Sequence, residues 1–259
     1  MFGAIFSFEL RQAFKRPMTY IFFGIYLLFS MFIALVSTGA FDTTQSDSNV
    51  TLNSAYAVAN LLVGFNGNIL GMLNSVVLVA IMANAIQKDY QYNIHALFFT
   101  KPISKAQYFF GRFLAAFLVG VFVMSGMLIG YATGLIPGIG TKLLGPFELK
   151  NFLQPFFVFL LPNVFILGVI FFSLTTFTRN TLAAYMTCII MLIGRFVAEN
   201  LGNNMDYAYG AGMLEPFGSN AYSYVTKYWM AAEQNTMMLP MNGLLLYNRL
   251  LWVSIALVI

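Results

Sequence analysis

Five or six long apolar stretches, separated by short polar segments, constrain this 259-residue chain more than any motif does. The clearest of them run from 20 to 39, from 108 to 135 and from 156 to 177. The hydrocarbon core of a bilayer is about 30 Å thick, so a spanning helix needs roughly 20 mostly apolar residues. A soluble domain of this length could not bury so many such runs in one core. The pattern therefore predicts a polytopic membrane protein.

The composition agrees with this prediction. Charged residues make up 8% of the chain, hydrophobic residues make up 59%, and the mean hydropathy is +0.77. Soluble domains carry roughly 25% charged residues, so this chain has too few to cover a water-facing surface. The net charge of +4 fits basic residues at the cytoplasmic edge of membrane helices. We therefore expect membrane lipid as a partner and no nucleic acid.

We predict an all-α protein with two regions. Residues 1–17 form a cytoplasmic interfacial helix. Apolar residues recur there at helical spacing on one side and basic residues lie nearer the other, and Pro17 then breaks the helix. Residues 18–259 form a transmembrane region with six spans, at about 19–38, 66–87, 107–133, 154–177, 181–199 and 243–259. A weak point at 64–68 separates the second span from a short interfacial piece before it.

Two further expectations concern the ends of the chain. The sixth apolar run has no polar flank, so we expect that span to be incomplete and the sequence to be the front part of a longer protein. With the N-terminus in the cytoplasm, the inner flanks contain Arg11, Lys15, Arg16, Lys88, Lys101, Lys105, Arg112 and Arg179, and the outer flanks contain Lys142, Lys150 and Lys227. Basic residues concentrate in cytoplasmic flanks. We therefore predict a multi-pass protein of the cell inner (plasma) membrane with a cytoplasmic N-terminus.

The sequence lacks the motifs of several enzyme classes. It has no phosphate-binding loop that ends in Gly-Lys-Ser or Gly-Lys-Thr, no Gly-x-Ser-x-Gly elbow and a single histidine, His95. We expect no enzyme activity, no metal and no cofactor in this chain. An ion-coupled carrier needs ionisable residues inside its spans, and only Arg195, with Glu199 one turn later, qualifies. This pair either reaches to the interface or forms a polar gate at the outer mouth.

The inner segment between the second and third spans is the most specific part of the chain. A short amphipathic stretch, 88–100, is stopped by Pro102, and a helix capped by Ser104 follows. This arrangement resembles the coupling helix of ABC-2 type permeases, although the family's usual Gly-Thr-Leu is replaced here by residues 93–97. The resemblance implies contact with a separate ATPase subunit, which binds ATP and Mg²⁺. The residues assigned to that contact are Lys88, Asp89, Tyr90, His95, Leu97, Pro102, Ser104 and Lys105. The alternative is an interfacial connector that faces lipid head groups.

A second resemblance covers the outer segment and the last apolar run. Short motifs stand in order at 215–218, 226–229, 233–236, Pro240 and 248–252. They are similar to the membrane part of bacterial permeases that are fused to a zinc aminopeptidase-like domain, whose zinc motif is absent here. Aromatic residues in this segment, including Tyr228 and Trp229, fit an interfacial belt or a lid over the outer exit.

A stripe of glycines in the third span, Gly126, Gly130 and Gly134, permits close helix approach. It serves either packing within the subunit or a dimer seam. Together these features predict the permease subunit of an ATP-driven exporter, working as a homodimer or heterodimer. The alternative is a membrane anchor for a C-terminal peptidase-like domain without transport.

Overall fold

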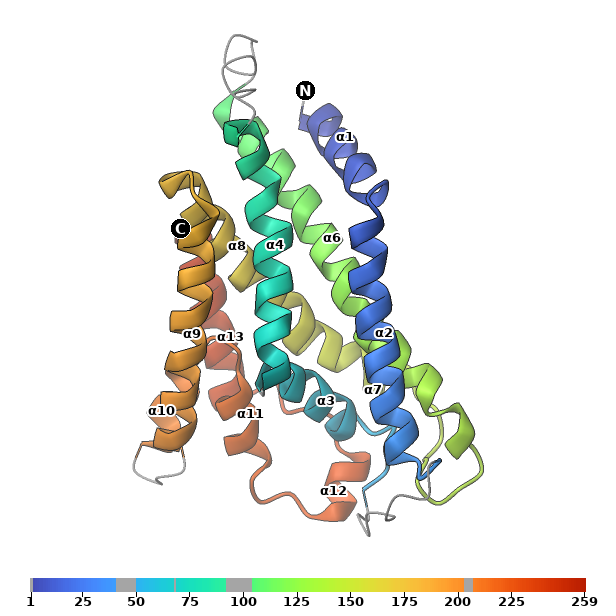
Figure 1. The fold of residues 1–259 in the computed structure, drawn as a ribbon. Helices are drawn as coiled ribbons and strands as arrows, with labels where there is room; N and C mark the ends of the chain where they lie inside the picture. Colours follow the sequence, from blue (N-terminus) through green and yellow to red (C-terminus); the bar gives the residue numbers. More distant parts are fainter. Residues whose placement is uncertain (1, 41–49, 68, 92–103, 203–206) are drawn as a thin grey trace.

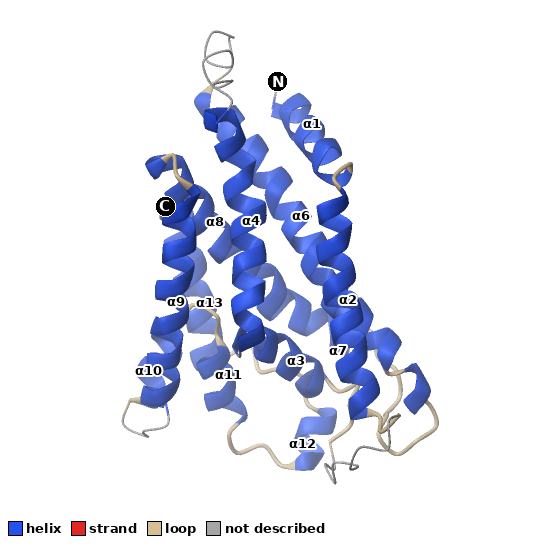
Figure 2. Cartoon of the chain, viewed as in Figure 1, coloured by secondary structure: helices blue, strands red, loops and turns tan. Residues whose placement is uncertain are grey.

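The computed structural model describes residues 2–40, 50–67, 69–91, 104–202 and 207–259, and every regular element in these ranges is helical (Figure 2). The prediction of an all-α protein is thus confirmed for the described part of the chain. Four helical segments there are long and apolar enough to cross a bilayer. They are α2 (Pro17–Ser37), α6 (Lys105–Gly134) with the 3-10 turn η1 (Ile136–Gly138), the continuous run α7 (Lys150–Pro155), η2 (Phe156–Leu160) and α8 (Leu161–Thr178), and α9 (Thr181–Gly202).

The other two predicted spans are helices that do not belong to this group. α4 (Ile69–Gln91) runs the length of the bundle between α9 and α2 (Figure 1), but the side chains of 69–73 lie outside the described residues. α13 (Gly243–Val258) has 16 residues, so at 1.5 Å per residue it is about 24 Å long. That length falls short of the roughly 30 Å of a hydrocarbon core.

The bundle has central and peripheral helices. In each spanning segment we compare the share of buried residues within its apolar 18-residue stretch. This share is 50% in α6 and 56% in the α7–α8 segment, but only 22% in α2 and in α9. The large apolar side chains that α2 and α9 expose include Ile21, Ile25, Leu28, Phe32, Met186, Ile189, Ile190 and Ile193. An apolar outer surface of this kind fits contact with lipid, because the hydrocarbon region offers no water to polar groups.

Two predicted breaks are where the sequence indicates them. α1 (Phe2–Phe14) ends before Pro17, which opens α2. α3 (Ala55–Gly67) ends within the weak point at 64–68, and α4 begins at Ile69. α1 and α3 both pack against the bundle, although α1 contains no buried residue. Val58 and Ala59 of α3 are fully buried, and α1 lies along the start of α6, where an ion pair joins Glu9 to Arg112.

The two ends of the bundle differ. The N-terminus, the end of α4, the start of α6 and the turn between α8 and α9 lie at one end (Figure 1). The short helices α10 (Ala208–Leu214), α11 (Ser219–Thr226) and α12 (Ala231–Thr236) lie at the other, together with α3. The described lysines and arginines of the predicted cytoplasmic flanks therefore share one end, where the Arg179 guanidinium lies 5.3 Å from the centre of the Tyr90 ring.

Candidate functional site

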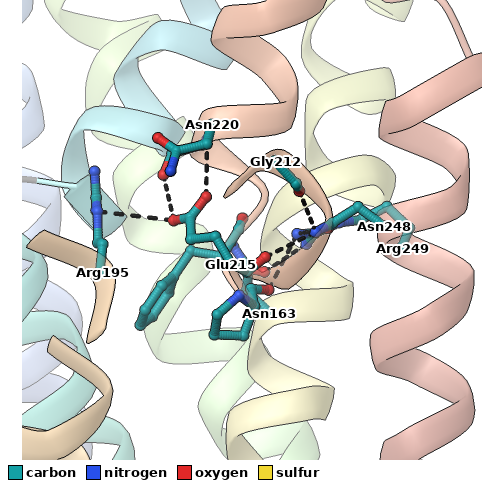
Figure 3. Close-up of polar contacts among 10 residues, drawn as sticks. Asn163, Arg195, Gly212, Glu215, Asn220, Asn248 and Arg249 are labelled. Atoms are coloured by element: carbon teal, nitrogen blue, oxygen red, sulfur yellow. Dashed lines mark hydrogen bonds and ion pairs between the residues drawn. The ribbon is translucent and has the colours of Figure 1, made fainter. Parts of the chain in front are cut away.

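The candidate site is a buried polar cluster formed by Asn163, Arg195, Glu215, Ser219, Asn248 and Arg249 (Figure 3). It joins the 215–218 and 248–252 motifs, whose nearest ends are 30 positions apart in the sequence. α8 contributes Asn163, α9 contributes Arg195, and α13 contributes the last two residues. Each of these six residues is at most 7% exposed. A polar group buried so deeply needs hydrogen-bond partners to offset its lost hydration.

Arg249 holds three parts of the chain together. Its Nη1 donates to Asn163 Oδ1 at 2.7 Å, and its Nη2 donates to the Pro216 carbonyl at 3.0 Å. Nε and Nη2 also donate to Asn248 Oδ1, at 3.0 and 2.6 Å. A guanidinium offers five N–H donors in a planar fork, so one side chain can join several acceptors. The arginine thereby fixes α13 to α8 and to the segment that follows α10.

Asn248 completes this connection through its amide. Its Nδ2 donates to the carbonyls of Gly212 and Glu215, each at 2.8 Å. These carbonyls belong to the end of α10, where the last turn of a helix leaves acceptors without intrahelical donors. Asn248 therefore caps the C-terminal end of α10.

Glu215 is the acidic centre of the cluster. The Ser219 hydroxyl donates to its Oε1, and the backbone N–H of Asn220 donates to its Oε2 at 2.8 Å. Arg195 Nε lies 3.7 Å from Oε1 and supplies the opposite charge. Gly218, with φ of +76°, lies in the turn between Glu215 and Ser219. A Cβ added to Gly218 would overlap the Arg249 guanidinium. Removing one partner from such a buried ionic group is costly, because it leaves the other charge uncompensated.

The outer-mouth residues that we predicted divide between two environments. Arg195 is 7% exposed, and its Nε lies 3.7 Å from Glu215 Oε1. Glu199 is exposed and lines a cavity of about 570 Å³ beside the cluster. Arg195 lines the same cavity. The sequence does not predict the Glu215 partner of Arg195, because Glu215 lies 20 residues later, in the segment between α10 and α11.

The aromatic pair Tyr228 and Trp229 lies outside that cavity lining. The Tyr228 side chain is 75% exposed. The Trp229 ring lies 6.1 Å from the Tyr56 ring of α3, and Tyr56 in turn lies 6.0 Å from Tyr222. Burial raises the pKa of the Tyr222 phenol, so its hydroxyl stays protonated and donates to the Tyr56 carbonyl at 3.1 Å. The contacts of Trp229 make it part of the packing between α3 and α11.

The predicted coupling segment is described only at its two ends. Lys88 and Tyr90 are half-buried in the last turns of α4, whereas the side chain of Asp89 lies outside the described residues. His95, Leu97, Pro102 and Lys101 also lie outside them. At the far end the predicted cap is confirmed, because the Ser104 hydroxyl accepts a hydrogen bond from the Gln107 backbone N–H at 3.3 Å. Lys105 follows it and is exposed.

Arg112 is a buried residue at this end whose role the sequence did not reveal. Its Nη2 lies 3.0 Å from Glu9 Oε1, its Nη1 donates to the Ala85 carbonyl at 2.6 Å, and its guanidinium lies 4.8 Å from the centre of the Tyr108 ring. The sequence indicates it only as one charge of the predicted cytoplasmic flank. It is 4% exposed and joins α1, α4 and α6. The sequence signal for this role is a charged residue within the predicted span 107–133, two helical turns after Ser104.

The glycine stripe faces α2 of the same chain. A Cβ added to Gly126 would lie 2.8 Å from the Phe23 carbonyl oxygen, and one added to Gly134 would lie 2.5 Å from the Met31 carbonyl oxygen. At Gly130 an added Cβ would overlap the Leu27 carbonyl and the Ser30 hydroxyl. Of the two uses that the sequence left open, the structure therefore supports packing within the subunit.

These observations indicate a helical membrane protein with a buried polar cluster that receives side chains from α8, α9, α11 and α13 and contacts the end of α10. Within the described ranges, no group of three or more His, Cys, Asp and Glu side chains could hold a metal ion. No family model, no curated protein and no solved structure matches the chain.

Proposed function

We propose that this chain is the membrane permease subunit of an ATP-driven exporter of the ABC-2 type. By this proposal six helices span a cell inner membrane with the N-terminus in the cytoplasm, and two permease subunits act together. The segment 88–105 contacts a separate ATPase subunit that binds ATP and Mg²⁺. The resemblance of that segment to a coupling helix is the origin of the proposal.

The observation that supports it most is the packing of the two helices that the segment connects. α6 packs mainly against α2 and α1, whereas α4 packs mainly against α8 and to a similar, smaller extent against α3, α6 and α9. A displacement of the connecting segment would therefore act on two groups of helices at once. Arg112 lies where the groups meet, because its Nη1 donates across to Ala85 of α4.

A cavity between the two groups gives such a displacement room. It has a volume of about 240 Å³ and is lined by residues of α1, α2, α4 and α6, among them Glu9, Lys88 and Arg112. Cores are close-packed, so helices move relative to each other only where the packing leaves space or has two arrangements. ATP binding to the proposed ATPase subunit would favour one of the two arrangements over the other.

The proposal is tested by purifying the tagged chain from its own host membranes and assaying Mg²⁺-dependent ATP hydrolysis in the sample. We expect the wild-type chain to carry an ATPase with it, and Leu97→Asp to reduce the co-purified activity about tenfold or more, because burying a carboxylate without a partner at the proposed contact is costly. Lys142→Gln, at the other end of the bundle, is the control and should retain the activity.

Two results would contradict the proposal. Undiminished ATPase activity with Leu97→Asp would show that the segment is not the coupling contact. A wild-type chain that inserts into the membrane but never co-purifies with an ATPase would favour the alternative function, a membrane anchor for a peptidase-like domain.

A further inference from the structure

The cavity beside the buried polar cluster has the composition of a ligand site. Its volume of about 570 Å³ lies within the roughly 300–1,000 Å³ of small-molecule pockets. In a chain with 8% charged residues, it is lined by three of them, Arg195, Glu199 and Lys227. The uncharged part of the lining includes the side chains of Asn60, Ser219, Asn220, Ser223 and Tyr224. Polar and charged residues therefore make up most of the lining.

The lining favours an anionic group. Two cations, Arg195 and Lys227, stand against one carboxylate, that of Glu199. Arg195 lies beside the Glu215 carboxylate, which in turn accepts hydrogen bonds from the Ser219 hydroxyl and the Asn220 backbone N–H. A charged group fixed in this way is preorganised, and less ordering entropy is lost when a ligand binds.

An independent observation concerns the Asn220 side chain. Its Nδ2 is buried and has no hydrogen-bond partner among the described residues, although Asn220 lines the cavity. A buried donor without a partner is rare in native structures, because its lost hydration is not compensated. An acceptor oxygen of a bound ligand would satisfy this N–H.

Glu199 places a carboxylate in the lining of the same cavity. It lies one helical turn from Arg195 on α9 and is exposed to the cavity. A carboxylate beside a site for an anion weakens the binding of a simple anion, but it favours a ligand that also carries an ammonium group. The Tyr224 ring, which lines the same space, offers a second contact of the kind that cations prefer.

We propose that this cavity binds a small zwitterion, with its oxyanion at Arg195, Lys227 and the Asn220 amide and its ammonium group at Glu199. The same chemistry occurs in free phosphoethanolamine and in the head group of phosphatidylethanolamine. The site does not depend on an ATPase partner, so its test is separate from that of the proposed function.

The test uses the full chain, purified in detergent, and two probes that share an anion. O-phosphoethanolamine carries the ammonium group, and ethyl phosphate lacks it. By titration calorimetry we expect O-phosphoethanolamine to bind about tenfold more tightly to the wild type, as one charge-assisted contact would give. Lys227→Gln should weaken both probes about tenfold. Glu199→Gln should weaken O-phosphoethanolamine alone and abolish the difference between the probes.

Matched controls and a competition complete the experiment. Lys142→Gln and Glu148→Gln change charges that do not line the cavity and should leave both affinities unchanged. Nanodiscs with phosphatidylethanolamine should displace O-phosphoethanolamine if the lipid is the natural source, and nanodiscs with phosphatidylglycerol alone should not; binding that survives in both would assign the site to a free zwitterion. The proposal is overturned if neither probe binds to the wild type, or if the preference for O-phosphoethanolamine persists in Glu199→Gln.

Discussion

Replacing Gly130 with alanine tests whether the glycine stripe is a seam between α2 and α6. On either side of Gly130, an added Cβ would lie 2.8 Å (Gly126) or 2.5 Å (Gly134) from a carbonyl oxygen of α2, whereas ordinary contacts begin at 3.4 Å. The helices would therefore have to separate by about 0.6 to 0.9 Å at these positions, and Gly130 itself is closer still. Overpacking of this kind costs about 1–3 kcal/mol.

Alanine also stabilises a helix relative to glycine by about 0.5–1 kcal/mol, so the expected net loss for Gly130→Ala is about 1–2 kcal/mol. For a chain of this size that loss lowers the melting temperature by roughly 2–8 °C. The assay is thermal unfolding of the purified protein in detergent. The control is Gly24→Ala, since an added Cβ at Gly24 of α2 meets nothing within 4 Å.

The result that would refute this argument is a melting temperature of Gly130→Ala equal to that of Gly24→Ala. A change of oligomeric state without a change in unfolding temperature would instead assign the stripe to a dimer seam. Cross-linking of cysteines introduced into α2 and α6 would show directly whether the two helices have separated.

Two further predictions concern buried charges. Arg112→Met should destabilise the protein by about 3–5 kcal/mol in thermal unfolding, because it leaves the Glu9 carboxylate buried without its partner; adding Glu9→Leu should recover most of the loss, and a double variant as unstable as the single one would contradict the pairing. Gly218→Ala should lower the unfolding temperature and loosen the end of α13, because alanine is strained at φ of +76° and its Cβ would displace Arg249; hydrogen exchange confined to other helices would count against this.

Much of the fold could be predicted because its causes are local. The four apolar runs near 19–38, 107–133, 154–177 and 181–199 are long helices, since hydropathy and helix length depend only on neighbouring residues. The same holds for the break at Pro17 and the Ser104 cap. The close packing of α3 was missed, because an apolar helix of 13 residues has the same composition whether it lies on a membrane surface or inside a bundle.

The candidate site was harder to predict. The sequence shows the motifs at 215–218 and 248–252 but not their contact, and Asn163 is only one polar residue in an apolar run. Arg195 was assigned to Glu199 because that residue is a neighbour on the same helix. Glu215, which lies between α10 and α11, also stands beside its guanidinium, and nothing in the spacing of α9 reveals this second carboxylate.

The order of apolar and polar segments by itself determined that this chain is helical, rich in membrane-type helices and basic at one end. Only the tertiary structure decided which helices are central, that the glycines face α2, and that Arg249 bonds to Asn163, 86 positions earlier. The physical reason is range. Hydropathy, breaks and caps act over one or two helical turns, whereas the partner of a buried polar group depends on which helices the whole bundle brings together.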